Sequence, residues 1–122
     1  MTVISAAQMD ALGASAAERF TNEMVAHAKA FVPERCRAWG EPGTVAVVRR
    51  ALHLASAHGF DLRGPMRLVV EAALIYGPNF DQDPHCAPML AILSGQQDQM
   101  HRAESLHAWM VDDLDRAVRE PR

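Results

Sequence analysis

The sequence has few cysteines and no long apolar run. Cys36 and Cys86 allow one disulfide at most, and a chain of 122 residues can bury a core without it, so we expect both to be structural thiols. A helix needs about 20 consecutive apolar residues to cross a bilayer, and no stretch of the sequence is that long. The N-terminus also lacks the basic start and apolar run of a secretory signal. These absences predict a cytoplasmic protein with no membrane insertion.

Strand-like alternation and an excess of positive charge are missing as well. The net charge is −3, and Lys29 is the one lysine among 12 basic residues. Without a basic field, we expect no nucleic-acid partner. Hydrophobic content of 49% and charged content of 22% are ordinary for a globular protein, so residues 1–122 are predicted to form a single helical domain.

The most apolar stretch lies between Gly64-Pro65 and Gly77-Pro78. Proline suits the first turn of a helix, and glycine followed by proline suits its end. Between them only Arg67 and Glu71 are charged, and they lie four residues apart on one face. A short helix that is apolar almost all round is a buried one. We therefore predict an all-α, compact bundle of five or six helices around a buried central helix at about 65–76.

The first half of the chain predicts a long amphipathic helix and then a shorter one. Ser5 and Gln8 form a capping-box pattern, Gly13 is a candidate break, and Pro33 ends the first helix. Its apolar face is Met9, Leu12, Ala16, Phe20, Met24, Ala28 and Phe31. Residues 34–39 predict a helical turn closed at Gly40. Residues 41–44 then predict a loop, with Thr44 capping a helix that ends at Gly59-Phe60.

The second half predicts a short helix and a long last one. Asp83 is the expected cap of a helix that begins at Pro84 or Pro88 and stops at Gly95. The last helix is expected from about Gln96 to about Arg119, with arginines near its end that complement the helix dipole. Its expected inner face is Met100, Ala103, Leu106, Met110, Leu114 and Ala117.

Metal binding is the main enzymatic alternative. Glu104-x-x-His107 has the spacing used in carboxylate-bridged di-iron bundles, and Glu23 and His27 are four apart on the first helix. A second Glu-x-x-His pair is missing, so helix-face polar pairs are the favoured interpretation. Asp81-x-Asp83 lacks the further ligands of a calcium loop, and helix capping by Asp83 is preferred. We predict no metal, no cofactor and no catalytic residues.

Partner contact is the remaining candidate activity. Cys36 lies between two arginines, but a lone cysteine is more often inert than nucleophilic. Five arginines gather in the second quarter of the chain: Arg35, Arg37, Arg49, Arg50 and Arg63. Aromatic residues and arginine are common at interface centres, so the candidate partner-binding residues are Trp39, Arg49, Arg50 and Trp109. The alternative for each tryptophan is that it closes an end of the bundle.

Six short strings stand at fixed spacing between about Met9 and about Leu106. They are residues 24–27, 31–36, 48–50, 57–59, 76–84 and 92–93, and the most specific is Gly77-x-x-Phe80-Asp81-x-Asp83-Pro84. Together they resemble a family of small helical bacterial proteins encoded beside type VI secretion effectors and their adaptor chaperones. The resemblance implies an accessory role and gives no catalytic residues.

The sequence therefore favours a non-enzymatic protein that binds another protein, as a co-adaptor or chaperone for a type VI secretion effector. Two alternatives stay open. One is an immunity protein that neutralises a co-encoded toxin. The other is a metal-dependent enzyme with a carboxylate and histidine site in a helical bundle. A homo-oligomer is also open.

Overall fold

A computed structural model describes residues 5–120, except for the side chains of residues 9–12. The elements are α1 (Ala6–Phe31), α2 (Pro33–Ala57), α3 (Arg63–Tyr76), the 3-10 turns η1 (Phe80–Gln82) and η2 (Pro84–Cys86), α4 (Ala87–Leu93) and α5 (Gln99–Arg119). Within the described range every element is helical, which confirms the predicted all-α class. No helix of this range is long and apolar enough to cross a membrane.

Helix α1 begins with the predicted capping box. Ser5 Oγ accepts from the Gln8 backbone N–H at 3.1 Å, and Gln8 Oε1 accepts from the Ser5 N–H at 2.8 Å. The helix continues through Gly13, the candidate break, and ends before Pro33, as predicted. On its expected apolar face Phe20, Met24 and Ala28 are buried, whereas Ala16 and Phe31 are exposed. The Met9 and Leu12 side chains lie outside the described residues.

Helix α2 confirms that the helical turn of residues 34–39 closes at Gly40, but it corrects the predicted loop at residues 41–44, which are helical, and the predicted cap at Thr44. It is helical from Pro33 to Ala57 except at Gly40, where φ is +74° and ψ is 174°. Thr44 is not an N-cap: its hydroxyl donates to the Gly40 carbonyl at 2.9 Å and faces the Cys36 carbonyl at 3.4 Å. One glycine changes the chain direction, so no loop is needed. The Thr44 hydroxyl satisfies carbonyls that the kink frees from the helix ladder.

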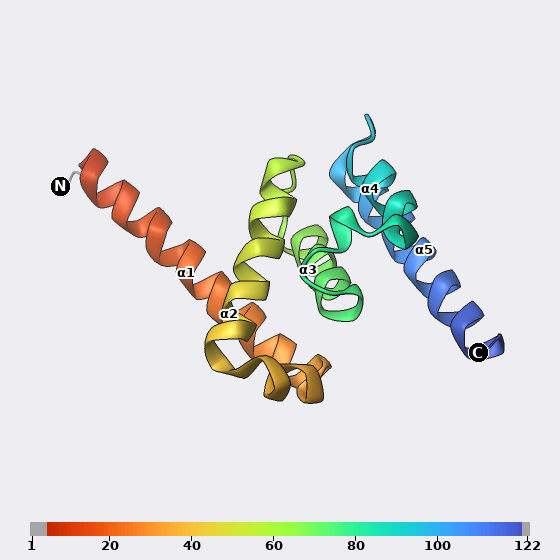
Figure 1. The fold of residues 1–122 in the computed structure, drawn as a ribbon. Coiled ribbons are helices and arrows are strands. Elements are labelled where there is room, and N and C mark those ends of the chain that lie inside the picture. Colours follow the sequence, from red (N-terminus) through yellow and green to blue (C-terminus); the bar gives the residue numbers. More distant parts are fainter. Residues whose placement is uncertain (1–4, 121–122) are drawn as a thin grey trace.

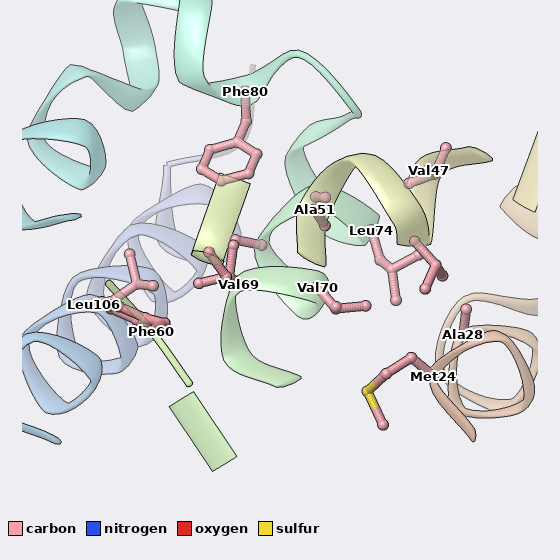
Figure 2. Packing of buried hydrophobic residues seen from close by; sticks show 14 of the residues in the cluster. Met24, Ala28, Val47, Ala51, Phe60, Val69, Val70, Leu74, Phe80 and Leu106 are labelled. Carbon is pink, nitrogen blue, oxygen red and sulfur yellow. The ribbon is translucent and has the colours of Figure 1, made fainter. Parts of the chain in front are cut away.

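Helix α3 is the predicted central helix, although it begins at Arg63 rather than at Pro65. Its buried residues are Pro65, Val69, Val70, Ala72, Ala73 and Leu74. Figure 2 shows Val70 and Leu74 on the side of α3 nearer α1 and α2, and Val69 toward Phe60 and Leu106. Leu68 and Ile75 are only half-buried. The expectation that neighbours enclose α3 on every side is therefore wrong for one side.

The ends of the other helices are set by residues close by in the sequence. Gly59 and Gly77 both have positive φ, and the Phe60 N–H donates to the Ala55 carbonyl, as the predicted helix ending requires. Asp83 accepts from the His85 backbone N–H at 2.9 Å, which confirms its capping role. Helix α5 begins at Gln99 behind the Asp98 cap rather than at Gln96.

The inner face of α5 is shorter than predicted. Ala103, Leu106 and Met110 are buried, and Asp113 continues this buried face by one turn. The outer part of the predicted face, made of Met100, Leu114 and Ala117, is exposed, so its assignment to the core is wrong. The reason is that α4 and α3 cover only part of the length of α5.

The arrangement is open, with α3 in the middle (Figure 1). Helices α1 and α2 lie on one side of α3, and α4 and α5 lie on the other, so the start of α1 and the end of α5 lie far apart. Residues 5–19 form the α1 arm, which runs out from the body, and each of its described side chains is exposed. This openness leaves a surface between α1, α3 and α5.

Candidate functional site

A shallow apolar hollow lies between α1, α3 and α5. It encloses about 180 Å³, and we call it the α1/α3/α5 groove. Its lining residues are Phe31 from α1, Leu68, Glu71 and Ile75 from α3, and His107, Met110, Val111 and Leu114 from α5. Six of these eight side chains are apolar. Because α3 is apolar on more sides than its neighbours cover, Leu68 and Ile75 form the floor.

The rim of this groove exposes large hydrophobic side chains. The exposed fraction is 42% for Phe31, 53% for Val111 and 40% for Leu114. Single exposed hydrophobic residues are common on monomeric proteins and need no explanation. Here three of them line one concavity together with two half-buried residues of α3, so this exposed apolar surface is contiguous rather than scattered.

A half-buried polar pair joins α1 and α3 beside the groove. His27 Nε2 lies 2.8 Å from Glu71 Oε2, and the His27 ring stacks on Phe31 with 5.4 Å between ring centres. Arg67 Nε lies 4.0 Å from the same Glu71 oxygen, one helical turn earlier on α3. These contacts fix Glu71, the one acidic side chain in the lining, against the body of the protein.

The exposed apolar surface continues along α5 beyond the groove. Val111, Leu114 and Val118 follow one another at spacings of three and four residues, and Val118 is 79% exposed. We call these three residues the α5 stripe. This spacing places the three side chains on one side of α5. The stripe and the groove share Val111 and Leu114.

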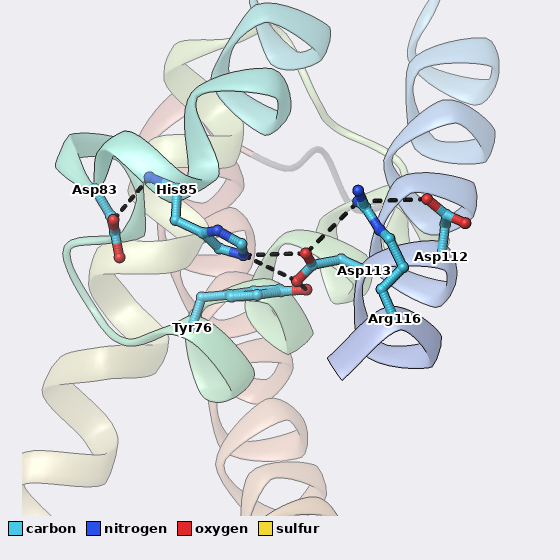
Figure 3. A network of polar contacts seen from close by, with 6 residues as sticks. All are labelled: Tyr76, Asp83, His85, Asp112, Asp113 and Arg116. Carbon is cyan, nitrogen blue, oxygen red and sulfur yellow. Dashed lines mark hydrogen bonds and ion pairs between the residues drawn. The ribbon is translucent and has the colours of Figure 1, made fainter. Parts of the chain in front are cut away.

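A polar cluster lies on another face of α5, around the buried Asp113. Tyr76 donates its hydroxyl hydrogen to Asp113 Oδ2 at 2.7 Å, and His85 Nε2 lies 3.0 Å from Asp113 Oδ1. Arg116 approaches Oδ1 at 3.8 Å. Figure 3 shows Tyr76 and His85 converging on this carboxylate from the α3 end and from η2. The cluster joins three separate segments of the chain.

The environment of Asp113 shifts the acid–base behaviour of the cluster. Burial disfavours its ionised form, but the hydrogen bonds from Tyr76 and His85 and the charges of His85 and Arg116 outweigh it. Together they hold the pKa of Asp113 below its usual value. Burial, followed by the hydrogen bond to Asp113, raises the pKa of Tyr76. Tyr76 therefore stays a donor and Asp113 an acceptor at neutral pH.

Trp109, one of the predicted partner residues, packs beside this cluster. Its ring centre lies 5.8 Å from that of Tyr76 and 5.9 Å from that of His85. The tryptophan is half-buried, whereas the His85 side chain is 61% exposed. The three rings pack together, and two of them, Tyr76 and His85, contact the Asp113 carboxylate.

The other predicted partner residues lie on α2, on the far side of α3. Trp39 is half-buried just before the Gly40 kink, and Arg49 is exposed. Arg50 Nη2 lies 3.0 Å from Asp81 Oδ1, and its Nε donates to Asn79 Oδ1 at 3.1 Å. Arg50 is therefore committed to holding the η1 segment against α2, and Trp109 belongs to a different surface.

The residues considered for metal binding are dispersed in the structure. Glu23 pairs with Arg63 and His27 with Glu71, while Glu104 and His107 are exposed on α5. Among the described side chains, no three potential His, Cys, Asp or Glu ligands gather in one place. Both cysteines are free and buried. Burial, with the charges of Asp83 and Asp113, raises the pKa of Cys86 to about 11.

Sequence reasoning missed the groove, the stripe and Asp113. Phe31 and Leu114 were assigned to the core because they continue a helical apolar face, and Asp113 was not singled out. The one available signal for Asp113 was a carboxylate at the spacing of Leu106 and Met110 on a helix face. A scan against protein-family models, a search of curated proteins and a search of solved structures each find no match.

Proposed function

We propose that this protein is a non-enzymatic accessory factor that binds another protein through the α1/α3/α5 groove. The observation that carries the proposal is the exposure of Phe31, Val111 and Leu114 around one hollow whose floor is Leu68 and Ile75. Burying apolar surface yields about 25 cal/mol per Å², so a partner that covers this patch gains free energy from the contact.

The shape of the groove suits an amphipathic helix. Two helices form its walls, a third forms its floor, and a helix laid between the walls would contact all three. Helix-in-groove recognition uses apolar anchors at i, i+3 or i+4, and i+7, and here such anchors would meet apolar side chains from all three helices. The expected partner segment is therefore helical, with one apolar face.

The motif strings resemble those of type VI secretion accessory proteins, and this resemblance suggests what kind of partner the groove would bind. On that basis we propose a cytoplasmic co-adaptor or chaperone that holds a secretion effector before its delivery. The support is the set of strings between residues 24 and 93, above all the one from Gly77 to Pro84. An immunity protein would bind its toxin equally well, so the functional assay must separate the two roles.

Capture from native cells tests the binding. The tagged wild-type chain should co-purify with a protein encoded by a neighbouring gene. Leu114→Asp should weaken this capture roughly tenfold or more, because it places a charge in a desolvated contact. Ser105→Asp is the matched control: it adds the same charge at an exposed position of α5 that faces away from the groove.

Two outcomes would reject the proposal. One is capture of nothing above background by the wild-type chain, and the other is equal capture by the two variants with helical circular dichroism intact. Co-expression with the captured protein then assigns the role. A chaperone leaves toxicity unchanged and its deletion abolishes delivery, whereas an immunity protein rescues the cell.

A further inference from the structure

A second hollow lies along the same junction of α1 and α3 as the groove. It encloses about 250 Å³, and we call it the arginine hollow. Its lining residues are Phe20, Glu23 and Met24 from α1, and Arg63, Gly64 and Arg67 from α3. The groove is mainly apolar, whereas half of these six residues are charged. Two arginines against one glutamate make the hollow positive.

One side of α3 connects the two hollows. Gly64 lines the arginine hollow, and Leu68, Glu71 and Ile75 line the groove. These four residues follow at spacings of four, three and four, which places them on the same side of a helix. At a rise of about 1.5 Å per residue, Gly64 and Ile75 lie about 16 Å apart along the helix axis. A partner helix of about three turns, laid along this side of α3, therefore meets both hollows.

The guanidinium of Arg63 is held in place from two sides. It forms an ion pair with Glu23, and its Cζ lies 4.6 Å from the centre of the Phe20 ring. Arg63 has thus already given up part of its side-chain freedom. A carboxylate of a partner that meets this arginine pays little further ordering cost.

Arg67 carries the positive charge that is least neutralised. Its Nε lies 4.0 Å from Glu71 Oε2, and the same oxygen already lies 2.8 Å from His27 Nε2. Within the described part of the chain Arg67 makes no hydrogen bond, although a guanidinium has five N–H donors. Because its side chain is 57% exposed, these donors are open to a carboxylate from outside the chain.

We propose that the partner helix bound in the groove carries an aspartate or glutamate at the end that lies over the arginine hollow, where Arg67 and Arg63 bind its carboxylate. This rests on the proposed function, because the same helix supplies the apolar anchors over Leu68 and Ile75. An acidic residue about one helical turn beyond the first anchor reaches the hollow. Arginine binds a carboxylate through two parallel hydrogen bonds, so this contact fixes the register of the helix in the groove.

Capture from native cells at two salt concentrations tests the contact. Arg67 is exposed, so Arg67→Gln keeps the fold while it removes the charge, and it should weaken capture about threefold to tenfold at low salt. This loss should shrink at high salt, because salt screens exposed charges, whereas the loss from Leu114→Asp should persist. Arg49→Gln is the matched control, since it removes an exposed arginine of α2 on the far side of α3. Equal capture by Arg67→Gln and the wild-type chain at low salt overturns the inference.

A charge exchange tests the chemistry of the partner. The captured protein is shortened until the segment that binds the groove is known, and the acidic residue at its end is replaced by lysine. The wild-type chain should then bind this segment less tightly, and Arg67→Glu should recover part of the loss. Circular dichroism of Arg67→Glu confirms that the new charge near Glu71 has not unfolded it. A bound segment with no acidic residue at that end overturns the inference.

The two proposals fail differently. Capture that is weakened by Leu114→Asp but not by Arg67→Gln rejects the carboxylate contact and keeps the proposed function. Capture that is weakened by Arg67→Gln but not by Leu114→Asp rejects the groove as the binding site. Capture of nothing by the wild-type chain rejects the proposed function, and the inference with it.

Discussion

A buried carboxylate at position 113 is tolerated because three other side chains surround it. Asp113 is 8% exposed, and it accepts from Tyr76 and His85 while Arg116 approaches from the solvent side. Among the described residues no buried side-chain polar atom lacks a hydrogen-bond partner. Loss of any donor would leave a buried charge partly unsatisfied, which costs more than the bond itself contributes.

Tyr76→Phe should therefore destabilise the fold by about 1–3 kcal/mol, the cost of removing a donor from a buried charged acceptor. It should also raise the pKa of Asp113, because a hydrogen bond that favours the carboxylate is lost. Urea unfolding measures the first effect and carboxyl NMR titration the second. In an Asp113→Asn background the same substitution should cost clearly less. An equal cost in both backgrounds would show that the hydroxyl acts elsewhere.

The pH dependence of stability follows from the sign of the Asp113 shift. A carboxyl whose folded pKa lies below its unfolded value of 3.8 stabilises the protein above that pH, and this stabilisation is lost as the pH falls through the folded pKa. The free energy of unfolding should thus fall below about pH 4, and less steeply in Asp113→Asn. The exposed Asp98, whose pKa is also lowered, contributes equally to both proteins. The same loss of unfolding free energy below pH 4 in the wild-type protein and in Asp113→Asn would contradict the prediction.

At the scale of the element, Gly77 ends α3 in a conformation that only glycine adopts readily. Its φ is 106° and its ψ is 161°, which is extended backbone of the mirror-image kind. Gly77→Ala should destabilise the protein by about 1–3 kcal/mol although the added methyl group would touch nothing. Gly13→Ala is the control, since its added methyl also meets open space but its backbone is helical. Denaturant midpoints should fall only for Gly77→Ala.

Local chemistry made the ends of the helices predictable. Each predicted helix end depends on contacts within a few residues of the chain, and each was found where it was expected. These ends are at Ser5 with Gln8, Pro33, Gly59-Phe60, Gly77-Pro78 and Asp83. The Gly40 region was not predictable in the same way. A glycine followed two residues later by a proline fits a loop and a one-residue kink equally well. The Thr44 hydroxyl caps a new helix in the first case and bonds back to Gly40 in the second.

The spacing of apolar residues predicts which side of α5 faces the core. It does not predict over what length of α5 other helices cover that side. Leu106 and Leu114 carry the same signal in the sequence, yet one is buried and the other is 40% exposed. The difference depends on where α3 and α4 end relative to α5, which no local pattern encodes. The groove is hidden from sequence analysis for the same reason, since it forms only where three helices meet.

At the scale of the whole molecule, the open arrangement of the helices is what leaves apolar surface available for binding. The central helix α3 contacts α1 and α2 on one side and α5 on the other, and α1 and α5 diverge from it (Figure 1). A closed bundle would cover Leu68 and Ile75 with the chain's own helices. Because the arm of α1 runs outward instead, those side chains are left for another chain to cover.

Small-angle scattering measures this openness directly. A compact domain of 122 residues has a radius of gyration of about 14 Å, and the isolated chain should exceed that value because the α1 arm and the end of α5 project in different directions. The Leu114→Asp variant at low concentration separates shape from association. A value near 14 Å for this variant would mean that the arm folds back over α3, and the groove would then be closed in solution. A larger value that persists on dilution requires an arm that stands free, with the groove open to its partner.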